Sequence, residues 1–389
     1  AEVEAIEAFL FSQAEFRHNV ITHHCEIRWT EEAGFLPLTD RDVNTLWGRM
    51  NKTVGRVYLT DIYNVIHSEF VPLFNPFQSY FDHLPSWDGV SDPIGDLADT
   101  VHVKSDQAEF RDYFRKWFVG ILPALLDDTV VNHEILVLIG EQGLYKTTWF
   151  NFLLPPELRC YFYTKTNSDR LNKDDLFSLT EFALICFEEL DGMRPAELNQ
   201  LKAMVTMPYV NERAAYGRNK ERHPHIASFC GTGNNVQFLT DPTGNRRWLP
   251  FEVSQIRDPH LHAIPYELVY SQAYALWKSG FCHWFSQEEI RKLNMHNSRF
   301  EVPNLEEDLI RTHFRKPFEG EAGIFVTAAD ILEQISSCLR YPLSPNKIGR
   351  IMAGLEFESI RYKGKRGYIA VKKTGEDIDR ERRSGALGL

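Results

Sequence analysis

The stretch that most constrains the fold is GEQGLYKTTWF, Gly140 to Phe150, because it follows the run EILVLI without a break. The apolar run has the length and composition of a buried strand, and a helix is expected after the loop. A strand, a glycine-containing loop and a helix in that order are the setting of a phosphate-binding loop. The stretch therefore predicts an α/β domain with such a loop at the end of an inner strand.

The loop fits the spacing G-x-x-x-x-G-K-T at its first glycine, its lysine and its threonine. In such a loop the backbone N–H groups wrap the phosphates of ATP, the lysine reaches the β- and γ-phosphates, and the threonine hydroxyl binds Mg²⁺. Taken alone, the stretch fits an ordinary strand-to-helix turn equally well. The residues predicted to bind ATP are Gly140, Glu141, Gln142, Gly143, Leu144, Tyr145, Lys146, Thr147 and Thr148.

Tyr145 stands at the sixth position, where this kind of loop normally has a glycine. Glycine lets the backbone approach the phosphates without a Cβ and tolerates unusual dihedral angles. Tyrosine can replace it only if its dihedral angles are ordinary and its ring points away from the nucleotide. We expect both, because Gly140 and Gly143 remain for the turn.

Polar side chains follow two further apolar runs. FALICF is followed by Glu188 and Glu189, and IASFCGTGN ends at Asn234. One carboxylate would orient the metal, the other would polarise the attacking water, and the amide would bind the γ-phosphate or its water. We therefore predict catalytic roles for Lys146, Glu188, Glu189 and Asn234, with Thr147 and Glu188 at the metal.

Arg246 and Arg247 lie together in the turn DPTGNRRW. Arginine can stabilise the charge that develops on a transferred phosphoryl group, usually across a subunit boundary. The alternative is a surface turn with two solvated cations. The chain contains the phosphate-binding loop, the carboxylates, the amide and the arginine pair in this order. All four together are far less probable by chance than any one of them, so an ATPase is favoured.

The pattern of apolar runs along the chain predicts an α/β fold with a mostly parallel sheet. We expect a mainly helical or mixed N-terminal segment with its leader (1–95), a P-loop ATPase domain (96–280), a small winged-helix-like domain (281–375) and a disordered tail (376–389).

Composition excludes several classes of protein. The net charge of −11 argues against a generally basic surface but allows a local basic groove. The six cysteines include no CxxC pair, and His23, His24 and Cys25 lack a second ligand cluster, so zinc is not expected. No apolar run approaches the ~18 residues of a membrane span. We expect a cytoplasmic protein of a bacterial host cell, and the missing initiator Met indicates a processed product or an excised fragment.

The order of these elements resembles the virulence-associated protein E family of phages and mobile elements. The matching stretches are GEQGLYKTT, ICFEELD, FCGTGNN and TGNRRWLPFEV, with WDG at 87–89 in the leader. That family resembles superfamily 3 helicases of the AAA+ class, so the resemblance implies a ring-shaped, hexameric motor that replicates mobile DNA. It implies Walker A roles for Lys146 and Thr147, Walker B roles for Glu188 and Glu189, a sensor role for Asn234, and an arginine finger at Arg246 or Arg247. Many such proteins carry a primase, which here would lie on a removed segment or a separate chain.

Two basic stretches are candidates for DNA contact. Arg218 and Lys220 lie at the tip of an expected hairpin, which the resemblance places in a central pore. Lys363, Lys365 and Arg366 lie in a second expected hairpin, which would be the wing of the C-terminal domain. The alternatives are a solvated charged turn for the first and a protein-interaction module for the second.

Three functions remain open from the sequence. The favoured one is an ATP-driven DNA helicase or translocase of a mobile element. The second is a nucleotide-gated protein that binds or loads at an origin without unwinding. The third, a P-loop kinase of small molecules, leaves the arginine pair and the basic hairpin unexplained.

Overall fold

The computed structural model describes residues 2–166, 173–212, 221–240, 245–302, 305–318, 320–336 and 344–386. The chain divides into two compact units, Ala1–Glu301 and Val302–Leu389. The sequence pattern places the start of the last domain at residue 281 instead. The difference arises because α11 (Gln287–Asn297) packs on the first unit, where His296 and Asn297 are buried.

The first 74 residues form an α/β segment with a hydrophobic core of its own. Its four strands lie in the order β3-β2-β1-β4, and its three helices bury residues such as Leu10, Leu46 and Ile62 in that core. The sequence predicts a mainly helical or mixed segment, and the structure has both helices and a sheet here. The elements are α1 (Val3–Gln13), β1 (Ala14–Asn19), β2 (His24–Trp29), β3 (Leu36–Pro37), α2 (Asp40–Thr53), α3 (Leu59–Ile66) and β4 (Leu73–Phe74).

A six-stranded sheet forms the centre of the first unit, in the order β5-β12-β6-β11-β8-β7. Strands β12, β6, β11, β8 and β7 run parallel, and only β5 pairs antiparallel, with β12. The prediction of a mostly parallel α/β sheet is confirmed. The strands are β5 (Val101–Val103), β6 (Ile135–Ile139), β7 (Phe162–Lys165), β8 (Leu184–Phe187), β11 (Ser228–Gly233) and β12 (Trp248–Ile256).

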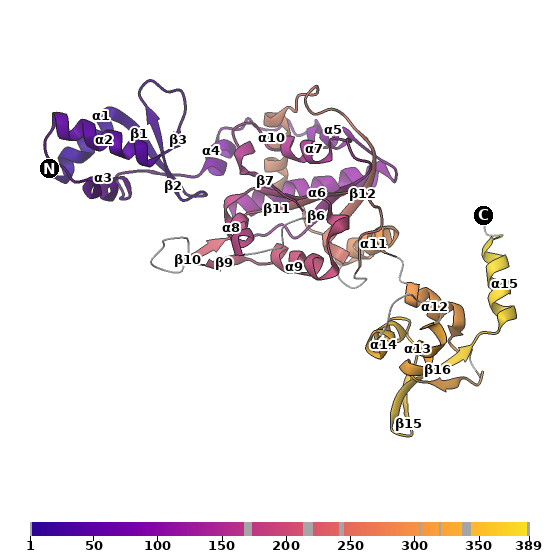
Figure 1. Ribbon diagram of the computed structural model, residues 1–389. Coiled ribbons are helices and arrows are strands. Elements are labelled where there is room, and N and C mark those ends of the chain that lie inside the picture. The colour runs from indigo at the N-terminus through magenta and orange to yellow at the C-terminus, as the bar shows by residue number, and fades with distance from the viewer. Residues whose placement is uncertain are drawn as a thin grey trace. The chain divides into compact units, whose positions relative to one another are not determined.

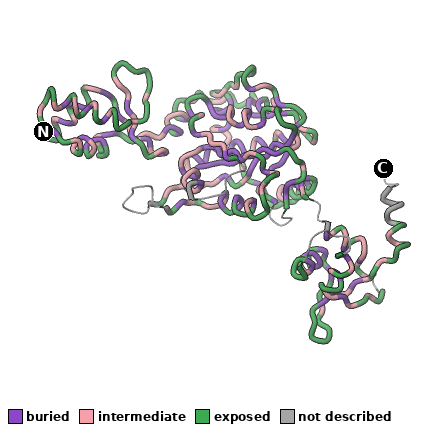
Figure 2. The backbone as a smooth tube through the Cα atoms, viewed as in Figure 1, coloured by how far each residue is buried: buried purple, intermediate pink, exposed green. Residues whose placement is uncertain are grey.

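Helices cover both faces of this sheet (Figure 1). Strand β6 shows why, since Leu136 and Leu138 enter one core while Ile135, Val137 and Ile139 enter the other. A strand that is apolar on both faces must be covered on both. Figure 2 shows the resulting buried centre. One face carries α5 (Pro93–Ala98), α6 (Gln107–Leu126), α7 (Lys146–Phe152) and α10 (Tyr266–Lys278), and the other carries α8 (Lys173–Glu181) and α9 (Pro195–Val205).

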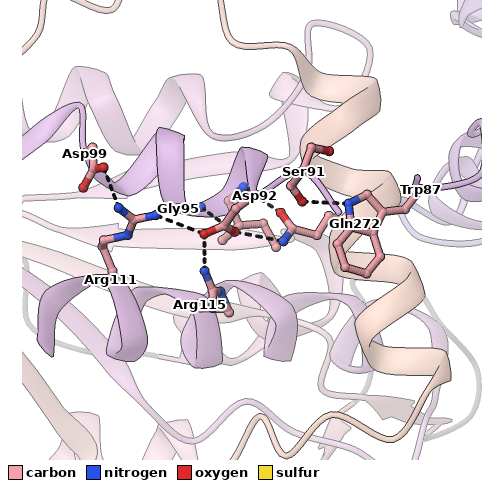
Figure 3. A network of polar contacts seen from close by, with 9 residues as sticks. Trp87, Ser91, Asp92, Gly95, Asp99, Arg111, Arg115 and Gln272 are labelled. Carbon is pink, nitrogen blue, oxygen red and sulfur yellow. Dashed lines mark hydrogen bonds and ion pairs between the residues drawn. The ribbon is translucent and has the colours of Figure 1, made fainter. Parts of the chain in front are cut away.

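A polar network fastens the leader to two of these helices (Figure 3). The leader contains α4 (Pro76–Asp82) and ends at Asp92, which caps α5. The Asp92 carboxylate accepts hydrogen bonds from Arg111 (3.0 Å) and Arg115 (2.5 Å) of α6 and from Gln272 (2.9 Å) of α10. The bonds tie three segments that are far apart in the sequence, and so fix the end of the leader on the central domain.

The second unit packs its helices and strands around a small core of its own. Two helices, α13 and α14, are followed by the hairpin β15–β16, which confirms the second expected hairpin and turns at Lys363 and Gly364. The tail that was predicted to be disordered contains α15, where Thr374 and Asp377 form a cap. The elements are α12 (Leu305–His313), β13 (Phe314–Arg315), β14 (Ile324–Val326), α13 (Ala328–Ser336), α14 (Pro345–Gly354), β15 (Ser359–Tyr362), β16 (Lys365–Lys372) and α15 (Gly375–Ala386).

Candidate nucleotide-binding site

Three of the predicted site segments meet at one edge of the central sheet. The phosphate loop follows β6, Glu188 follows β8 and Asn234 follows β11, and these neighbouring parallel strands all end at this edge. The N–H of Gly140 donates to the carbonyl of Gly233 at 3.1 Å, which joins the loop to the end of β11. A cavity of about 440 Å³ lies here and is lined by residues 142–148, 188–189 and 232–234. Carboxyl ends of parallel strands, where the chain changes direction across the sheet, are the usual place for a ligand.

The Lys146 side chain is buried beside the loop, with 8% of the residue exposed. Its ammonium donates to the carbonyls of Gly140 (2.6 Å) and Glu141 (2.7 Å), and its third acceptor is the Asn234 side-chain oxygen at 3.5 Å. Burial lowers the pKa of Lys146, while the nearby Asp191 carboxylate opposes that shift. A buried cation whose described hydrogen-bond acceptors are all uncharged fits an anion such as a phosphate.

Thr147 and Glu188 lie side by side in the cavity. The Thr147 hydroxyl donates to a Glu188 carboxylate oxygen at 2.8 Å, although 41 residues separate them in the chain. Hydroxyl and carboxylate oxygens are the ligands that Mg²⁺ prefers, and a Mg²⁺ site commonly takes only one or two carboxylates besides water and substrate phosphates. Among the residues that the structure describes, no group of three or more His, Cys, Asp or Glu is arranged to hold a metal ion. The oxygens present fit a metal that is bound together with phosphates.

Asp191 braces the end of β11, a role that the sequence did not predict. One carboxylate oxygen accepts the N–H of Asn234 (3.1 Å), and the other accepts the N–H (3.1 Å) and the side-chain amide (2.8 Å) of Asn235. The carboxylate thereby places the Asn234 side chain near Lys146. The only signal in the sequence was an acid three residues after Glu188, which has no assigned partner until the two strands are paired.

The backbone of Tyr145 differs from the prediction. Its φ of 61° and ψ of 18° lie in the left-handed region, so the expectation of ordinary dihedral angles was wrong. The position keeps the conformation for which glycine is normally used, because Lys146 begins α7 directly after the turn. Tyr145 is 42% exposed and is one of the residues that line the cavity. Glu189 is also left-handed, with φ 54° and ψ 44°, so the site contains two strained residues.

The family of the chain follows from a comparison with known domains. The virulence-associated protein E-like domain family matches residues 82–302, which include the loop, both strand ends and the arginine turn. The chain belongs to this family. No curated protein matches the chain.

A solved structure shares the fold of this virulence-associated protein E-like chain. An apo structure of the C-terminal region of NrS-1, residues 305–718 of that protein, is 12% identical, with a TM-score of 0.50, and the match covers 95% of this chain and 99% of that one. The A form of the same apo region is 13% identical over the same shares, with a TM-score of 0.47. At this identity the likeness concerns the fold alone.

The arginine pair of this virulence-associated protein E-like domain lies at the opposite edge of the sheet from the loop. Arg247 immediately precedes β12, and the first residue of β12, Trp248, pairs in parallel with the first residue of β6, Ile135. The loop follows the last residue of β6, so the length of a five-residue strand, roughly 15 Å, separates the two. The structure therefore does not bring Arg246 and Arg247 to the nucleotide cavity of their own chain.

The arginines instead border a second cavity, of about 360 Å³, together with His133, Glu134 and Trp284. Arg246 is exposed and Arg247 is half-buried. Burial and the neighbouring Arg246 lower the pKa of Arg247. Desolvation raises the pKa of Glu134 to about 7, although Lys116 and Arg247 oppose the shift. No sequence pattern indicates that Glu134 lines a cavity, because in the sequence it is only the residue at the start of an expected strand.

The predicted DNA-contacting residues belong to two stretches of the chain. Arg218 and Lys220 lie outside the described residues, but the two arms beside them, β9 (Tyr209–Glu212) and β10 (Glu221–Pro224), pair antiparallel. In the second unit Lys363, Lys365 and Arg366 are all exposed. Lys347, on the helix that precedes this hairpin, is paired with Glu306. Within the described parts of the chain, no helix is long and apolar enough to cross a bilayer.

Proposed function

We propose that the chain is an ATPase that couples the hydrolysis of ATP to movement along DNA, in the replication of a phage or another mobile element. The observation that carries the proposal is the buried Lys146 ammonium, held by loop carbonyls beside the Thr147–Glu188 pair and Asn234. A turn with an incidental lysine would leave that lysine in solvent, because burying a cation without a counter-ion costs free energy. The burial of Lys146 therefore favours a phosphate site over an ordinary turn.

Each residue of the cavity has a proposed role. Residues 140–148 would hold the phosphates, with Lys146 on the β- and γ-phosphates and Asn234 near the γ-phosphate. Thr147 and Glu188 would hold Mg²⁺, which when bound neutralises phosphate charge. Glu189 would polarise the attacking water, and its exposed position in the cavity wall leaves it accessible to that water. Arg246 or Arg247 would serve the site of a second copy, because neither lies at the site of its own chain.

The proposed partner is DNA, and the proposed assembly is a hexameric ring, which rests on the family resemblance to AAA+ helicases. The exposed Lys363, Lys365 and Arg366 provide a cationic hairpin tip in a chain of net charge −11. The strands β9 and β10 pair antiparallel and flank the stretch that contains Arg218 and Lys220, which supports the proposal. We include a primase, on another segment or chain, as a proposed partner.

The deciding experiment is ATP turnover with Mg²⁺, with and without single-stranded or forked DNA. Lys146→Ala should abolish turnover because the phosphates lose the only lysine of the loop. Glu189→Gln should bind ATP with a Kd in the range of about 1 μM to 1 mM, yet hydrolyse it at least about 100-fold more slowly. Lys202→Ala, which removes another buried lysine on α9, is the matched control and should keep turnover.

Near-native turnover by Lys146→Ala would reject the site. Near-native turnover by Glu189→Gln would reject the role of Glu189 and leave Glu188 as the residue to test. Strand displacement on the forked duplex separates the two DNA-linked functions. DNA-stimulated turnover without displacement would favour the nucleotide-gated loading protein over the helicase.

A further inference from the structure

The turn that carries the arginine pair is held from inside the molecule by one buried amide. The turn is the short helix η3 (Asn245–Arg247), which leads into β12. Asn297, the last residue of α11, is fully buried. Its side-chain NH₂ donates to the carbonyls of Asn245 (2.8 Å) and Trp248 (3.0 Å), the residues on either side of the two arginines. Two carbonyl acceptors require the nitrogen there, so the orientation of the amide is settled.

Other contacts from the same segment hold the strand and the loop beside this turn. The Asn245 side chain donates to the Glu301 carboxylate at 2.8 Å. His296 donates through Nε2 to the carbonyl of Pro250 in β12 at 2.6 Å. The N–H groups of Phe238 and Leu239 both donate to the carbonyl of Phe300, at 2.9 and 3.0 Å. The end of α11 and the residues after it therefore fix the backbone on both sides of Arg246 and Arg247.

The hydrogen bonds of Asn297 and Asn245 around the arginine turn form a clamp. Its buried polar groups have only part of their hydrogen-bonding capacity satisfied. The side-chain oxygens of Asn297 and Asn245 are buried and have no hydrogen-bond partner among the described residues. An apolar residue at position 297 would leave the carbonyls of Asn245 and Trp248 without this donor, and one at position 245 would leave the Glu301 carboxylate without its donor. What the amides do provide is a fixed backbone under two side chains, of which Arg246 is exposed and Arg247 half-buried.

We propose that Asn297 is a positioning residue, which orients Arg246 and Arg247 toward the nucleotide bound by a second copy of the chain. The inference rests on the proposed ATPase function. Asn297 acts through the turn, since it touches the carbonyls that flank the arginines. The partner must be a second copy because the arginines and the loop of one chain lie at opposite edges of the sheet. A cation that meets a developing phosphoryl charge must be held close to its productive position, and an error of about 1 Å can cost about 100-fold in rate.

The test is ATP turnover in mixtures of variants. Asn297→Ala alone should lower kcat about 10- to 100-fold and leave Mg²⁺–ATP binding within about twofold, because its loop is intact. Mixing it with Lys146→Ala should restore activity, since the lysine variant supplies native arginine turns to intact loops. Mixing it with the Arg246→Ala, Arg247→Ala double variant should restore nothing, because every arginine turn in that mixture is defective.

A matched control separates positioning from loss of stability. Asn19 is equally buried and donates its amide to Glu26 and Tyr161, both at 2.8 Å, far along the chain from the arginines. Asn19→Ala should keep kcat within about twofold even if the free energy of unfolding falls. If Asn297→Ala does not fold, Glu301→Ala and Glu301→Gln decide, because only glutamine retains an oxygen that can accept from Asn245. We expect Glu301→Ala to lower kcat and Glu301→Gln to keep it.

The outcomes have distinct meanings. The positioning role is overturned if Asn297→Ala keeps native kcat, or if Lys146→Ala does not rescue its loss. If Asn297→Ala does not fold, the positioning role is also overturned when Glu301→Ala and Glu301→Gln have the same kcat. Failure of the proposed function itself would be seen in the native protein, which would then show no ATP turnover that depends on Lys146.

Discussion

Tyr145 and Glu189 both have left-handed backbone conformations at the edge of the nucleotide cavity. For a residue with a Cβ that conformation costs about 1 to 2 kcal/mol, and such residues gather at functional sites. At Tyr145 this free-energy cost arises because the loop has the backbone conformation of a glycine at a position occupied by tyrosine. At Glu189 the same conformation ends the strand and sends the chain into η2 (Leu190–Gly192), which places Asp191 under β11.

Substitutions at Tyr145 should therefore follow backbone preference. Tyr145→Gly should raise the free energy of unfolding by up to about 1 kcal/mol, since relief of strain is partly offset by the greater freedom of glycine in the unfolded chain. ATP turnover should stay the same or rise modestly. Tyr145→Val should lower stability by about 1 kcal/mol or more, and Tyr145→Asn should lie between the two. Urea denaturation and ATP turnover measure these effects.

The opposite pattern at Tyr145 would overturn the proposed function. If the native protein neither binds nor hydrolyses ATP and Tyr145→Gly restores both, the loop is blocked by its tyrosine.

The brace at Asp191 gives a second prediction for a single residue. Asp191→Asn keeps the shape of the side chain but turns one acceptor into a donor that faces the N–H of Asn235 or Asn234. We expect a loss of about 1 kcal/mol in stability and roughly tenfold in kcat, because Asn234 is no longer fixed near Lys146. Asp88→Asn is the control, since Asp88 also accepts two backbone N–H groups but lies in the leader. An unchanged kcat in Asp191→Asn would show that the brace is only structural.

Among the elements, the segment from His133 through β6 links the two edges of the sheet. Glu134 lies before β6 at the arginine edge, and the phosphate loop lies after it at the nucleotide edge. A carboxylate with a raised pKa thus precedes β6, and a buried lysine with a lowered pKa follows it at the start of α7. Desolvation is the leading cause of both shifts.

The raised pKa of Glu134 predicts how stability depends on pH. In the folded protein its pKa is about 7, against an ordinary value of 4.5. Between these values the folded state binds more protons than the unfolded state, so the stability contributed by this group falls as the pH rises from about 4.5 to about 7. Glu134→Gln should remove that part of the pH dependence. Urea denaturation at pH 5 and pH 8 for both proteins measures it, and the same pH dependence in both would exclude Glu134 as its source.

For the whole molecule, the decisive question is which unit holds DNA. Neutralising Lys363, Lys365 and Arg366 in the second unit should weaken DNA binding and reduce its salt dependence by roughly one unit of slope for each phosphate that these cations no longer neutralise. Binding measured from about 50 to about 200 mM salt gives the slope. Lys372→Ala is the control, because Lys372 lies on the same strand but donates to Gln334 at 2.5 Å. Equal slopes for the native and triple-variant proteins would remove this hairpin from the DNA interface.

Local patterns in the sequence were enough to predict the parallel α/β sheet, the loop at the end of β6, and the polar residues that follow β8 and β11. They were enough because a buried strand is a short apolar run, and because parallel strands end at a common edge. The same reasoning could have placed Arg247 at the other edge, since it precedes a strand of that sheet. The family resemblance likewise depended on stretches that are each continuous in the sequence.

Only the tertiary structure decided how these stretches are held. The left-handed backbone of Tyr145 is visible only in the folded loop. The Asp191 brace and the clamp of Asn297 on the arginine turn depend on strand register and on contacts between residues that are 40 or more positions apart. A single side chain such as Asn297 carries no local signal of its partners, because an asparagine at the end of a helix has the same sequence pattern whether it faces solvent or a distant turn. Its two hydrogen bonds exist only once α11 has packed against β12 and buried the amide there.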